Sequence, residues 1–265
     1  MISFKQFLSE QAVGDKPDYK SIDVEQAIAI LNTHCKNAVW MLKEDRPIYR
    51  GDPDRLPHAA LKTSGFAAVD TTATVRKSQN TLNWYTEILD NHPDRKNFPK
   101  RSRCFIATTN MLRAYAYIGS SKATSDVIHI IPADDAKIGL VNREDMWDTR
   151  VTMFGRTEDI ENWNYSFEEL LPYTPASFKS LVEFDKLLKA GDKNAIKKFK
   201  SVFGVQYAET NGFLKEILNA YSERNTKHAA CTTATMPHNY KGEVWVGGKV
   251  VLITSRMWEQ LRNAL

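Results

Sequence analysis

The sequence predicts an α+β fold, and three observations support the prediction. Apolar residues with helical spacing fill the segment after residue 23, short β-rich runs lie near residues 102–107 and 126–132, and two further β-rich runs come close to the C-terminus. Long helical segments separate these runs, so the strands must pair non-locally. That arrangement is typical of α+β domains.

The first long helix is expected from Val24 onward. Val24, Ile28 and Leu31 fall on one helical stripe. Asp23 suits the N-cap position, and Gln26, three residues later, completes a capping box. The helix should end before the proline of "PIYRGD".

Later elements follow from similar signals. "SRCFIA" predicts a short strand, "TTNMLRAYAY" a capped helix and "DVIHIIP" another strand. A helical insertion is expected at about 156–220, containing "SLVEFDKLLKAG" and "NAIKKFKSVFG". In "GEVWVGGKVVLIT" the two central glycines predict a two-residue β-hairpin, which a final helix follows.

Composition restricts the class of protein. The chain has 265 residues, of which 42% are hydrophobic and 26% charged, which is typical of a soluble globular protein. No apolar run reaches the roughly 18 residues of a membrane span, so we expect no membrane partner. The net charge of +4 favours phosphate-bearing partners. Three scattered cysteines fit neither a zinc site nor a disulfide framework, and we expect no metal.

Three short pieces occur in a fixed order: "IYRG" at 48–51, "CFIATTN" at 104–110 and "YKGEVWV" at 240–246. Together they resemble the Arg, Ser-Thr-Ser and Glu signature of the cholera-toxin-like mono-ADP-ribosyltransferases. In layout the resemblance covers about residues 45–255. It implies an ADP-ribosyltransferase-like split β-sandwich with an N-terminal helix and a helical insertion, using NAD as a substrate and no metal.

The resemblance implies a role for each matching residue. Glu243 would stabilise the oxocarbenium-like transition state that forms as nicotinamide leaves the ribose. Arg50 would hold phosphate or ribose oxygens of NAD, and Gly51 would let the ligand approach the backbone. Thr108 and Thr109 would shape the nicotinamide side. Taken singly, Arg50 also suits an ordinary surface arginine, the threonines a helix cap, and Glu243 a solvated hairpin start.

Two positions depart from the family pattern. Ala107 replaces the first serine, and Lys241 stands two residues before Glu243, where related enzymes carry glutamate or glutamine. A charged lysine would repel an arginine acceptor. The acceptor is therefore expected to be another site on a host protein or a nucleic acid, and simple hydrolysis of NAD stays open as a further alternative. The alternative is a non-catalytic protein that keeps the fold and binds nucleic acid or a host factor.

Two polar segments could contact a nucleotide. In "VRKSQNTLNWYTEI", at 75–88, Arg76, Ser78 and Asn80 could bind NAD or the acceptor above two packed aromatics. A solvated helix start with core aromatics is the other interpretation. "FPKRSR", at 98–103, predicts either a phosphate-facing edge or a solvated charge run.

The N-terminus suggests a biological setting. "MISFKQFLSE" resembles the leader peptides of proteins packaged into the heads of large tailed bacteriophages, which a protease cuts after a Leu/Ile-x-Glu triplet; Leu8-Ser9-Glu10 fits. This implies action in the host cytoplasm after packaging in the virion. The expected organisation is a leader at 1–10, a linker at 11–22, and an ADP-ribosyltransferase-like domain at 23–265.

Overall fold

The computed structural model contains two compact units, each built from helices and strands, so the α+β prediction is confirmed. It describes residues 18–51, 56–75, 83–118 and 127–264. Unit 1 comprises the described residues within Met1–Arg76, Asn97–Glu144 and Ala229–Leu265. Unit 2 comprises those within Lys77–Lys96 and Asp145–His228. The expected leader lies outside the described residues.

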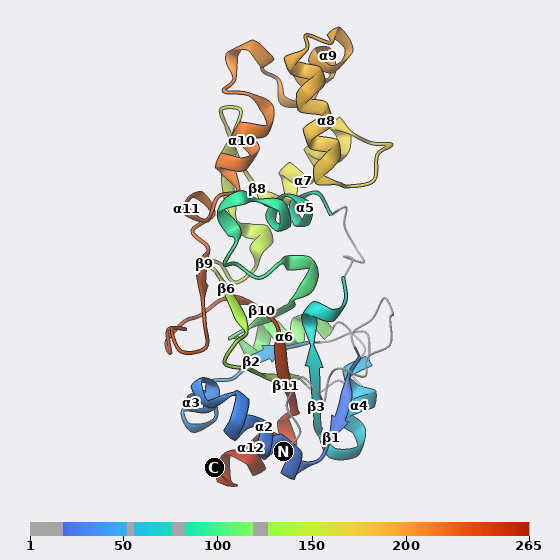
Figure 1. Ribbon diagram of the computed structural model, residues 1–265. Coiled ribbons are helices and arrows are strands. Elements are labelled where there is room, and N and C mark those ends of the chain that lie inside the picture. The colour runs from blue at the N-terminus through green and yellow to red at the C-terminus, as the bar shows by residue number, and fades with distance from the viewer. Residues whose placement is uncertain (1–17, 52–55, 76–82, 119–126, 265) are drawn as a thin grey trace. The chain divides into compact units, whose positions relative to one another are not determined.

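Unit 1 is organised around a nine-stranded sheet in which every neighbouring pair is antiparallel (Figure 1). The strand order is β1-β3-β11-β5-β2-β4-β10-β6-β9. The strands are β1 (Lys20–Ile22), β2 (Ile48–Arg50), β3 (Phe66–Asp70), β4 (Phe105–Thr108), β5 (Ile128–Pro132), β6 (Lys137–Val141), β9 (Ala229–Cys231), β10 (Glu243–Gly247) and β11 (Lys249–Thr254). Strand β1 occupies the end of the expected 11–22 linker.

The helices of unit 1 begin with the predicted capping box. Asp23 Oδ1 accepts a hydrogen bond from the Gln26 backbone N–H at 2.7 Å, and Gln26 Oε1 accepts one from the Asp23 N–H at 3.0 Å. The helices are α2 (Val24–His34), η1 (Lys36–Ala38), α3 (Val39–Lys43), α4 (Leu56–Ser64), η2 (Thr71–Ala73), η4 (Arg101–Arg103), α6 (Met111–Ile118) and α12 (Ser255–Ala264). The single helix expected after Asp23 is therefore interrupted at Cys35.

The predicted hairpin at Gly247 and Gly248 is wrong. Strand β10 pairs with β4 and β6, whereas β11 pairs with β3 and β5. Gly248 has a positive φ of 126. Two hydrogen bonds join it to Thr71: the Gly248 N–H donates to Thr71 Oγ1 at 2.9 Å, and the Thr71 N–H donates to the Gly248 carbonyl at 3.0 Å. The glycines turn the chain, but long-range pairing decides which strands become neighbours.

Both faces of the central strands are buried. All five residues of β5 are buried, as are the four apolar residues of β11 that follow Lys249. These strands accordingly consist of nearly continuous apolar runs instead of alternating polar and apolar residues. The core of unit 1 is continuous along the sheet, and α2, α3 and α12 contribute to it.

Unit 2 is built around an aromatic core. Phe154 has its ring centroid 4.5 Å from that of Phe203 and 5.3 Å from that of Phe199. The elements are α5 (Trp84–Asn91), η3 (Pro93–Arg95), η5 (Met146–Asp148), β7 (Arg150–Met153), β8 (Arg156–Asp159), α7 (Ile160–Leu170), α8 (Phe178–Lys189), α9 (Lys193–Phe203), η6 (Tyr207–Glu209), α10 (Phe213–Ala220) and α11 (Glu223–Thr226). The helical segment expected at 156–220 lies within this unit. No helix in the described part of the chain is long and apolar enough to span a bilayer.

Candidate functional site

The three sequence pieces lie on adjacent strands of unit 1. Strand β2 carries "IYR", β4 carries "FIAT" and β10 begins at Glu243, and these strands are consecutive in the sheet. In register, Tyr49 is opposite Thr108, and Thr108 is opposite Glu243. Residues in register across antiparallel strands share a face. Tyr49 and Thr108 are 59 positions apart in the sequence and Thr108 and Glu243 are 135 apart, yet the fold places all three in one row.

Glu243 is buried, and the residue is only 2% exposed. Its Oε1 accepts a hydrogen bond from Trp245 Nε1 at 2.5 Å. The indole is itself held by Phe98, whose ring meets it edge-on at 5.2 Å, and by the Arg101 guanidinium, 5.3 Å from the ring centroid. The solvated hairpin start considered from the sequence is therefore wrong, and the structure places an oriented carboxyl group in the interior.

The backbone before Glu243 is clamped from two sides. The Gly242 N–H donates to Thr109 Oγ1 at 3.0 Å, and the Thr109 N–H donates to the Gly242 carbonyl at 3.1 Å. On the other side, the Glu243 N–H donates to the Arg143 carbonyl at 3.0 Å. Tyr240 Oη donates to the carbonyls of Val141 and, at 3.0 Å, Glu243. Burial and the nearby Glu243 raise the pKa of the Tyr240 hydroxyl.

Thr108 joins the site to helix α6. Its hydroxyl accepts a hydrogen bond from the Asn110 N–H at 3.0 Å, and Asn110 Oδ1 accepts one from the Leu112 N–H at 3.0 Å. The polar "TTN" segment thus ends β4 and caps the helix that follows. Thr108 is 1% exposed and stands directly opposite Glu243, so the hydroxyl position paired with the carboxylate is Thr108, while Ala107 lies on the opposite face.

Arg50 occupies a different face from Glu243. Because side chains alternate along a strand, Arg50 points away from the row that contains Tyr49. Its guanidinium lies 4.8 Å from the Phe105 ring centroid, and Nη1 donates to the Ile106 carbonyl at 3.0 Å. Gly51, which follows it, is buried. The structure therefore brings Thr108, Thr109 and Glu243 together but places the Arg50 side chain on the other side of the sheet.

Two aromatic side chains extend the row beyond Thr108. Tyr49 is in register with His129, and their ring centroids are 5.2 Å apart. Burial raises the pKa of the Tyr49 hydroxyl, with a further contribution from Asp45. Burial lowers the pKa of His129 to about 4. At neutral pH, His129 is therefore a neutral ring beside the site.

Sequence reasoning missed Trp245, Tyr240 and Arg143. Trp245 could have been found, since strand alternation places the second residue after Glu243 on the same face. Tyr240 and Arg143 act through backbone groups, for which a single sequence gives no signal. Lys241 is exposed. The proposed nucleotide contacts Arg76, Ser78 and Asn80 lie outside the described residues.

The two aromatics of the 75–88 segment, Trp84 and Tyr85, are buried, which confirms the core interpretation for them. The "FPKRSR" run is only partly solvated, because Arg101 is buried while Lys100 is exposed. Phe98 and Arg101 are buried and cover Trp245, while Arg103 donates from Nη1 to the Thr72 carbonyl at 2.7 Å. This run packs over the indole that positions Glu243.

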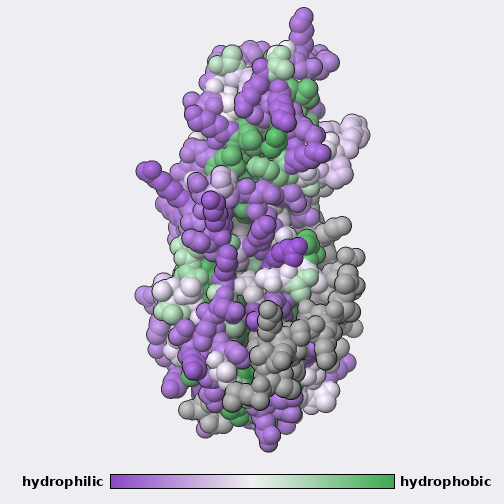
Figure 2. All heavy atoms as spheres, viewed as in Figure 1, coloured by the Kyte–Doolittle hydropathy of each residue, from purple (hydrophilic) through white to green (hydrophobic). Residues whose placement is uncertain are grey.

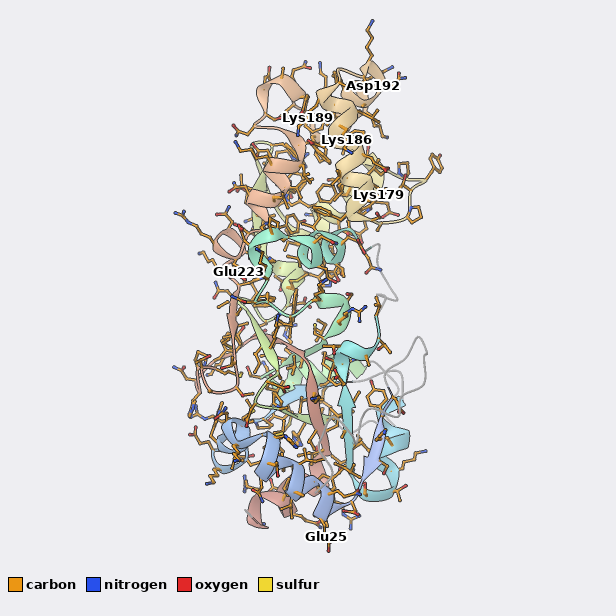
Figure 3. The ribbon with its side chains drawn as sticks, in the orientation of Figure 1. Glu25, Lys179, Lys186, Lys189, Asp192 and Glu223 are labelled. Carbon is orange, nitrogen blue, oxygen red and sulfur yellow. The ribbon has the colours of Figure 1, made fainter. Side chains whose placement is uncertain are left out.

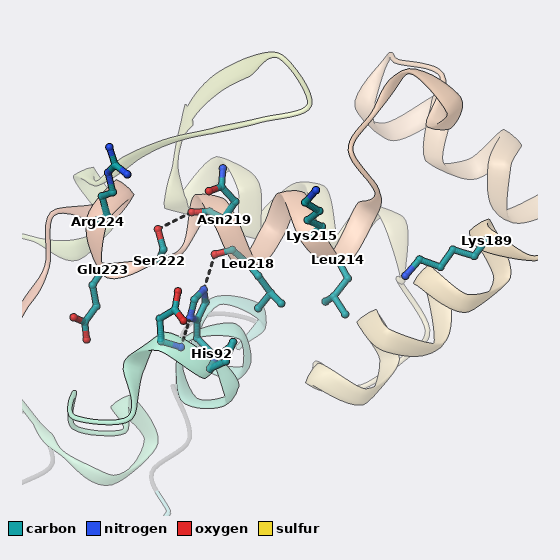
Figure 4. A pocket seen from close by; sticks show the side chains of 11 residues that line it. His92, Lys189, Leu214, Lys215, Leu218, Asn219, Ser222, Glu223 and Arg224 are labelled. Atoms are coloured by element: carbon teal, nitrogen blue, oxygen red, sulfur yellow. Dashed lines mark hydrogen bonds between the residues drawn. The ribbon is translucent and has the colours of Figure 1, made fainter.

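Unit 2 contains a cavity of about 790 Å³ (Figure 4). Leu214 and Leu218 of α10, both labelled in Figure 4, give it an apolar side. The Asp94 N–H donates to His92 Nδ1, so His92 Nε2 is the donor to the Leu218 carbonyl at 2.5 Å. Both ring nitrogens are engaged and burial lowers the His92 pKa, so this histidine has a structural role.

No cluster of three or more potential metal ligands occurs among the residues that the structure describes. Comparisons with protein-family models, curated proteins and solved structures found no match.

Proposed function

We propose that this chain is an NAD-dependent mono-ADP-ribosyltransferase with an ADP-ribosyltransferase-like split β-sandwich fold. The observation that carries the proposal is the row formed by Tyr49, Thr108 and Glu243 on three adjacent strands. These strands hold the three pieces that resemble the family signature. A chance resemblance between scattered sequence pieces gives no reason for their strands to be neighbours in register.

In this proposal Glu243 supplies the decisive charge. As the bond between nicotinamide and ribose breaks, positive charge grows on the sugar, and a carboxylate that also accepts the ribose 2′-hydroxyl stabilises it. Trp245 donates to Oε1 and thereby orients the carboxyl group within the row. Because the indole and the clamped backbone fix the carboxyl group in advance, little reorganisation is needed in the transition state.

Neighbouring groups would shape the nicotinamide side. Thr108 lies opposite Glu243 and Tyr49 opposite Thr108, so a hydroxyl and an aromatic ring border the carboxyl group. Thr109 acts through the backbone of Gly242. NAD is a substrate in this scheme, and no metal takes part.

Arg50 requires a separate test, because its side chain lies on the face opposite Glu243. If it holds NAD phosphates, Arg50→Lys raises the KM for NAD, since lysine lacks the planar fork of donors. If instead it braces β4 through Ile106 and Phe105, the same change lowers stability and leaves KM unaltered. Measuring both quantities in one variant distinguishes the two roles.

The proposed acceptor is a host macromolecule, either a protein or a nucleic acid, reached in the host cytoplasm after delivery in a phage virion. Lys241 supports an acceptor that is not an arginine. It is exposed and lies two residues before Glu243, where a cation repels a guanidinium and attracts a phosphate.

The test is Glu243→Gln, which keeps the shape of the side chain and still accepts from Trp245. With radiolabelled NAD and host lysate, we expect nicotinamide release to fall about a hundredfold or more. The matched control is Glu25→Gln, which alters an exposed glutamate of α2 (Figure 3). Circular dichroism verifies that both variants fold. Undiminished release from Glu243→Gln would falsify the proposal.

A non-catalytic protein that keeps this fold is the second candidate. Lys241 and the loss of a hydroxyl at Ala107 favour it. Absence of nicotinamide release and of any transferred label from the unaltered chain, with host lysate present, would select this candidate.

A further inference from the structure

Helix α9 of unit 2 has an unusual charge distribution. It carries four lysines and no carboxylate, so its own charge matches the +4 net charge of the whole chain. Helix α7, which contacts α9 in the same unit, carries three glutamates and no cation. Positive charge is thus concentrated on one helix of this unit.

Every exposed side chain of α9 can donate a hydrogen bond. Its exposed positions within the helix are Lys193, Asn194, Lys197, Lys200 and Ser201. The three lysines follow i, i+4, i+7 spacing and therefore form one stripe about 10 Å long. Hydrophilic side chains project from this part of the surface in Figure 2.

The lysines of α9 are not neutralised by any carboxylate in the part of the chain that the structure describes. In the neighbouring helix α8, Lys179 pairs with Glu183 at 3.7 Å and Lys189 with Asp185 at 2.7 Å (Figure 3 labels both lysines). By contrast, no lysine of α9 lies within 4.0 Å of a carboxylate oxygen of any residue that the structure describes. Their charge is available to an external anion.

The helix is held firmly from its other side. Phe199 and Phe203 pack into the aromatic core, Asp192 caps the first turn by accepting from the Ala195 N–H at 2.8 Å, and Gly204 ends the helix with φ 75. The lysine stripe therefore sits on a rigid support. A ligand that binds it meets cations already arrayed along one line.

We propose that the exposed face of α9 binds the phosphate backbone of a nucleic-acid duplex, without sequence preference. One strand of a duplex carries a phosphate every 3.4 Å along its axis, so a stripe of about 10 Å faces about three phosphates. Asn194 and Ser201 add neutral donors of the kind that contact phosphates. This binding does not depend on the proposed transferase activity.

The chemistry of the face favours a duplex over two other polyanions. Acidic proteins usually dock through an apolar or aromatic centre within a polar rim, and α9 exposes no apolar residue. Single strands usually bind through base stacking on aromatic side chains, and the exposed positions of α9 include none. What remains is contact with phosphates alone, which suits a duplex.

The experiment measures binding of a fluorescein-labelled 20-base-pair DNA duplex to the full chain by anisotropy, between 50 and 200 mM salt. Lys193→Gln, Lys197→Gln and Lys200→Gln are combined in one variant, because glutamine keeps helix propensity. We expect weaker binding and a log–log salt slope that is shallower by about 2.7, from three lost phosphate contacts.

The control variant combines Lys36→Gln, Lys43→Gln and Lys62→Gln, which removes three exposed lysines from unit 1 and changes the net charge equally. We expect it to retain the slope and affinity of the unaltered chain. Equal losses of duplex affinity and salt slope in the two variants would overturn the proposal, as would the absence of duplex binding by the unaltered chain at 50 mM salt. Tighter binding of labelled poly-glutamate than of the duplex would reassign the face to acidic proteins. Circular dichroism of both variants excludes unfolding.

Discussion

Trp245 Nε1 donates a hydrogen bond to Glu243 Oε1 at 2.5 Å, and both side chains are 2% exposed or less. A buried carboxyl group needs such donors, since burial without a partner is strongly unfavourable. The two residues are two positions apart on β10 and share one face of the strand. The geometry of the proposed site therefore depends on an indole that has no role in the family signature.

Replacing Trp245 with phenylalanine removes this donor and keeps an aromatic ring against Phe98. We expect a loss of about 1 to 3 kcal/mol in the free energy of unfolding, because a buried carboxyl oxygen loses its hydrogen-bond donor. Nicotinamide release should also fall, since the carboxyl group is no longer held. Urea unfolding and the release assay measure the two effects.

Trp258→Phe is the matched control. Trp258 Nε1 donates to Asp45 Oδ1 at 2.9 Å, which is the same kind of bond at a position away from Glu243. This variant should lose stability without losing nicotinamide release. Equal loss of release in both variants would show that Trp245 acts only through stability.

Gly242→Ala should be more destabilising than an ordinary glycine substitution. Gly242 has φ 151, and an added Cβ would lie 2.7 Å from Tyr240 Oη and 2.9 Å from the Arg143 carbonyl. A backbone carbonyl cannot move aside as a side chain can. We expect the free energy of unfolding to fall by about 3 kcal/mol or more, which is in the upper range for a strained backbone conformation. Urea unfolding measures this loss.

Gly155→Ala provides the comparison. Gly155 also has a positive φ, of 75, but an added Cβ would meet no atom within 4 Å. Only the cost of placing an alanine at a positive φ remains, so we expect the free energy of unfolding to fall by about 1 to 2 kcal/mol. Similar losses at the two glycines would contradict the close packing described around Gly242.

The sequence predicted the strands and helix of the site better than it predicted which strands pair with one another. Strands β4 and β10 were expected because apolar and β-branched residues gather there, and α6 because "TTN" supplies caps. The hairpin was wrong because a glycine pair shows where the chain turns and cannot show that β10 pairs with β4 and β6. Pairing depends on residues more than a hundred positions away.

The positions of individual side chains were predictable only in part. Strand alternation indicates that Trp245 shares the face of Glu243 and that Arg50 and Tyr49 point in opposite directions. Strands β6 and β9 gave weaker signals, because β9 is a three-residue edge strand and β6 contains Gly139. Gly139 is required there, since an added Cβ would lie 2.4 Å from the Phe98 ring that covers Trp245.

Thr109→Val tests the backbone clamp. Valine matches the shape of threonine but leaves the Gly242 N–H without its 3.0 Å acceptor. We expect a loss of about 1 to 3 kcal/mol in the free energy of unfolding. Thr109→Ser keeps the hydroxyl and should retain most of the free energy of unfolding of the unaltered chain. If serine and valine destabilise equally, the hydroxyl is not the group that matters.

His129 should make unit 1 less stable in mild acid. Burial lowers its pKa to about 4 in the folded chain, against about 6.5 when unfolded. Between these values the unfolded state binds a proton that the folded state does not. The contribution of neutral His129 to the free energy of unfolding is therefore complete above pH 6.5. It is lost as the pH falls toward 4, by up to about 1.4 kcal/mol per pH unit.

His129→Phe isolates this effect, because phenylalanine keeps a ring between Tyr49 and Trp258 and cannot titrate. Hydrogen exchange of the β5 and β11 amides reports on unit 1 alone, which matters because His92 and His228 of unit 2 also have lowered pKa values. We expect protection of these amides to fall less steeply with acid in the variant than in the unaltered chain. His34→Gln, at a half-exposed position, is the control for removing a histidine elsewhere in unit 1. Identical profiles for His129→Phe and the unaltered chain would mean that another group binds the proton on unfolding.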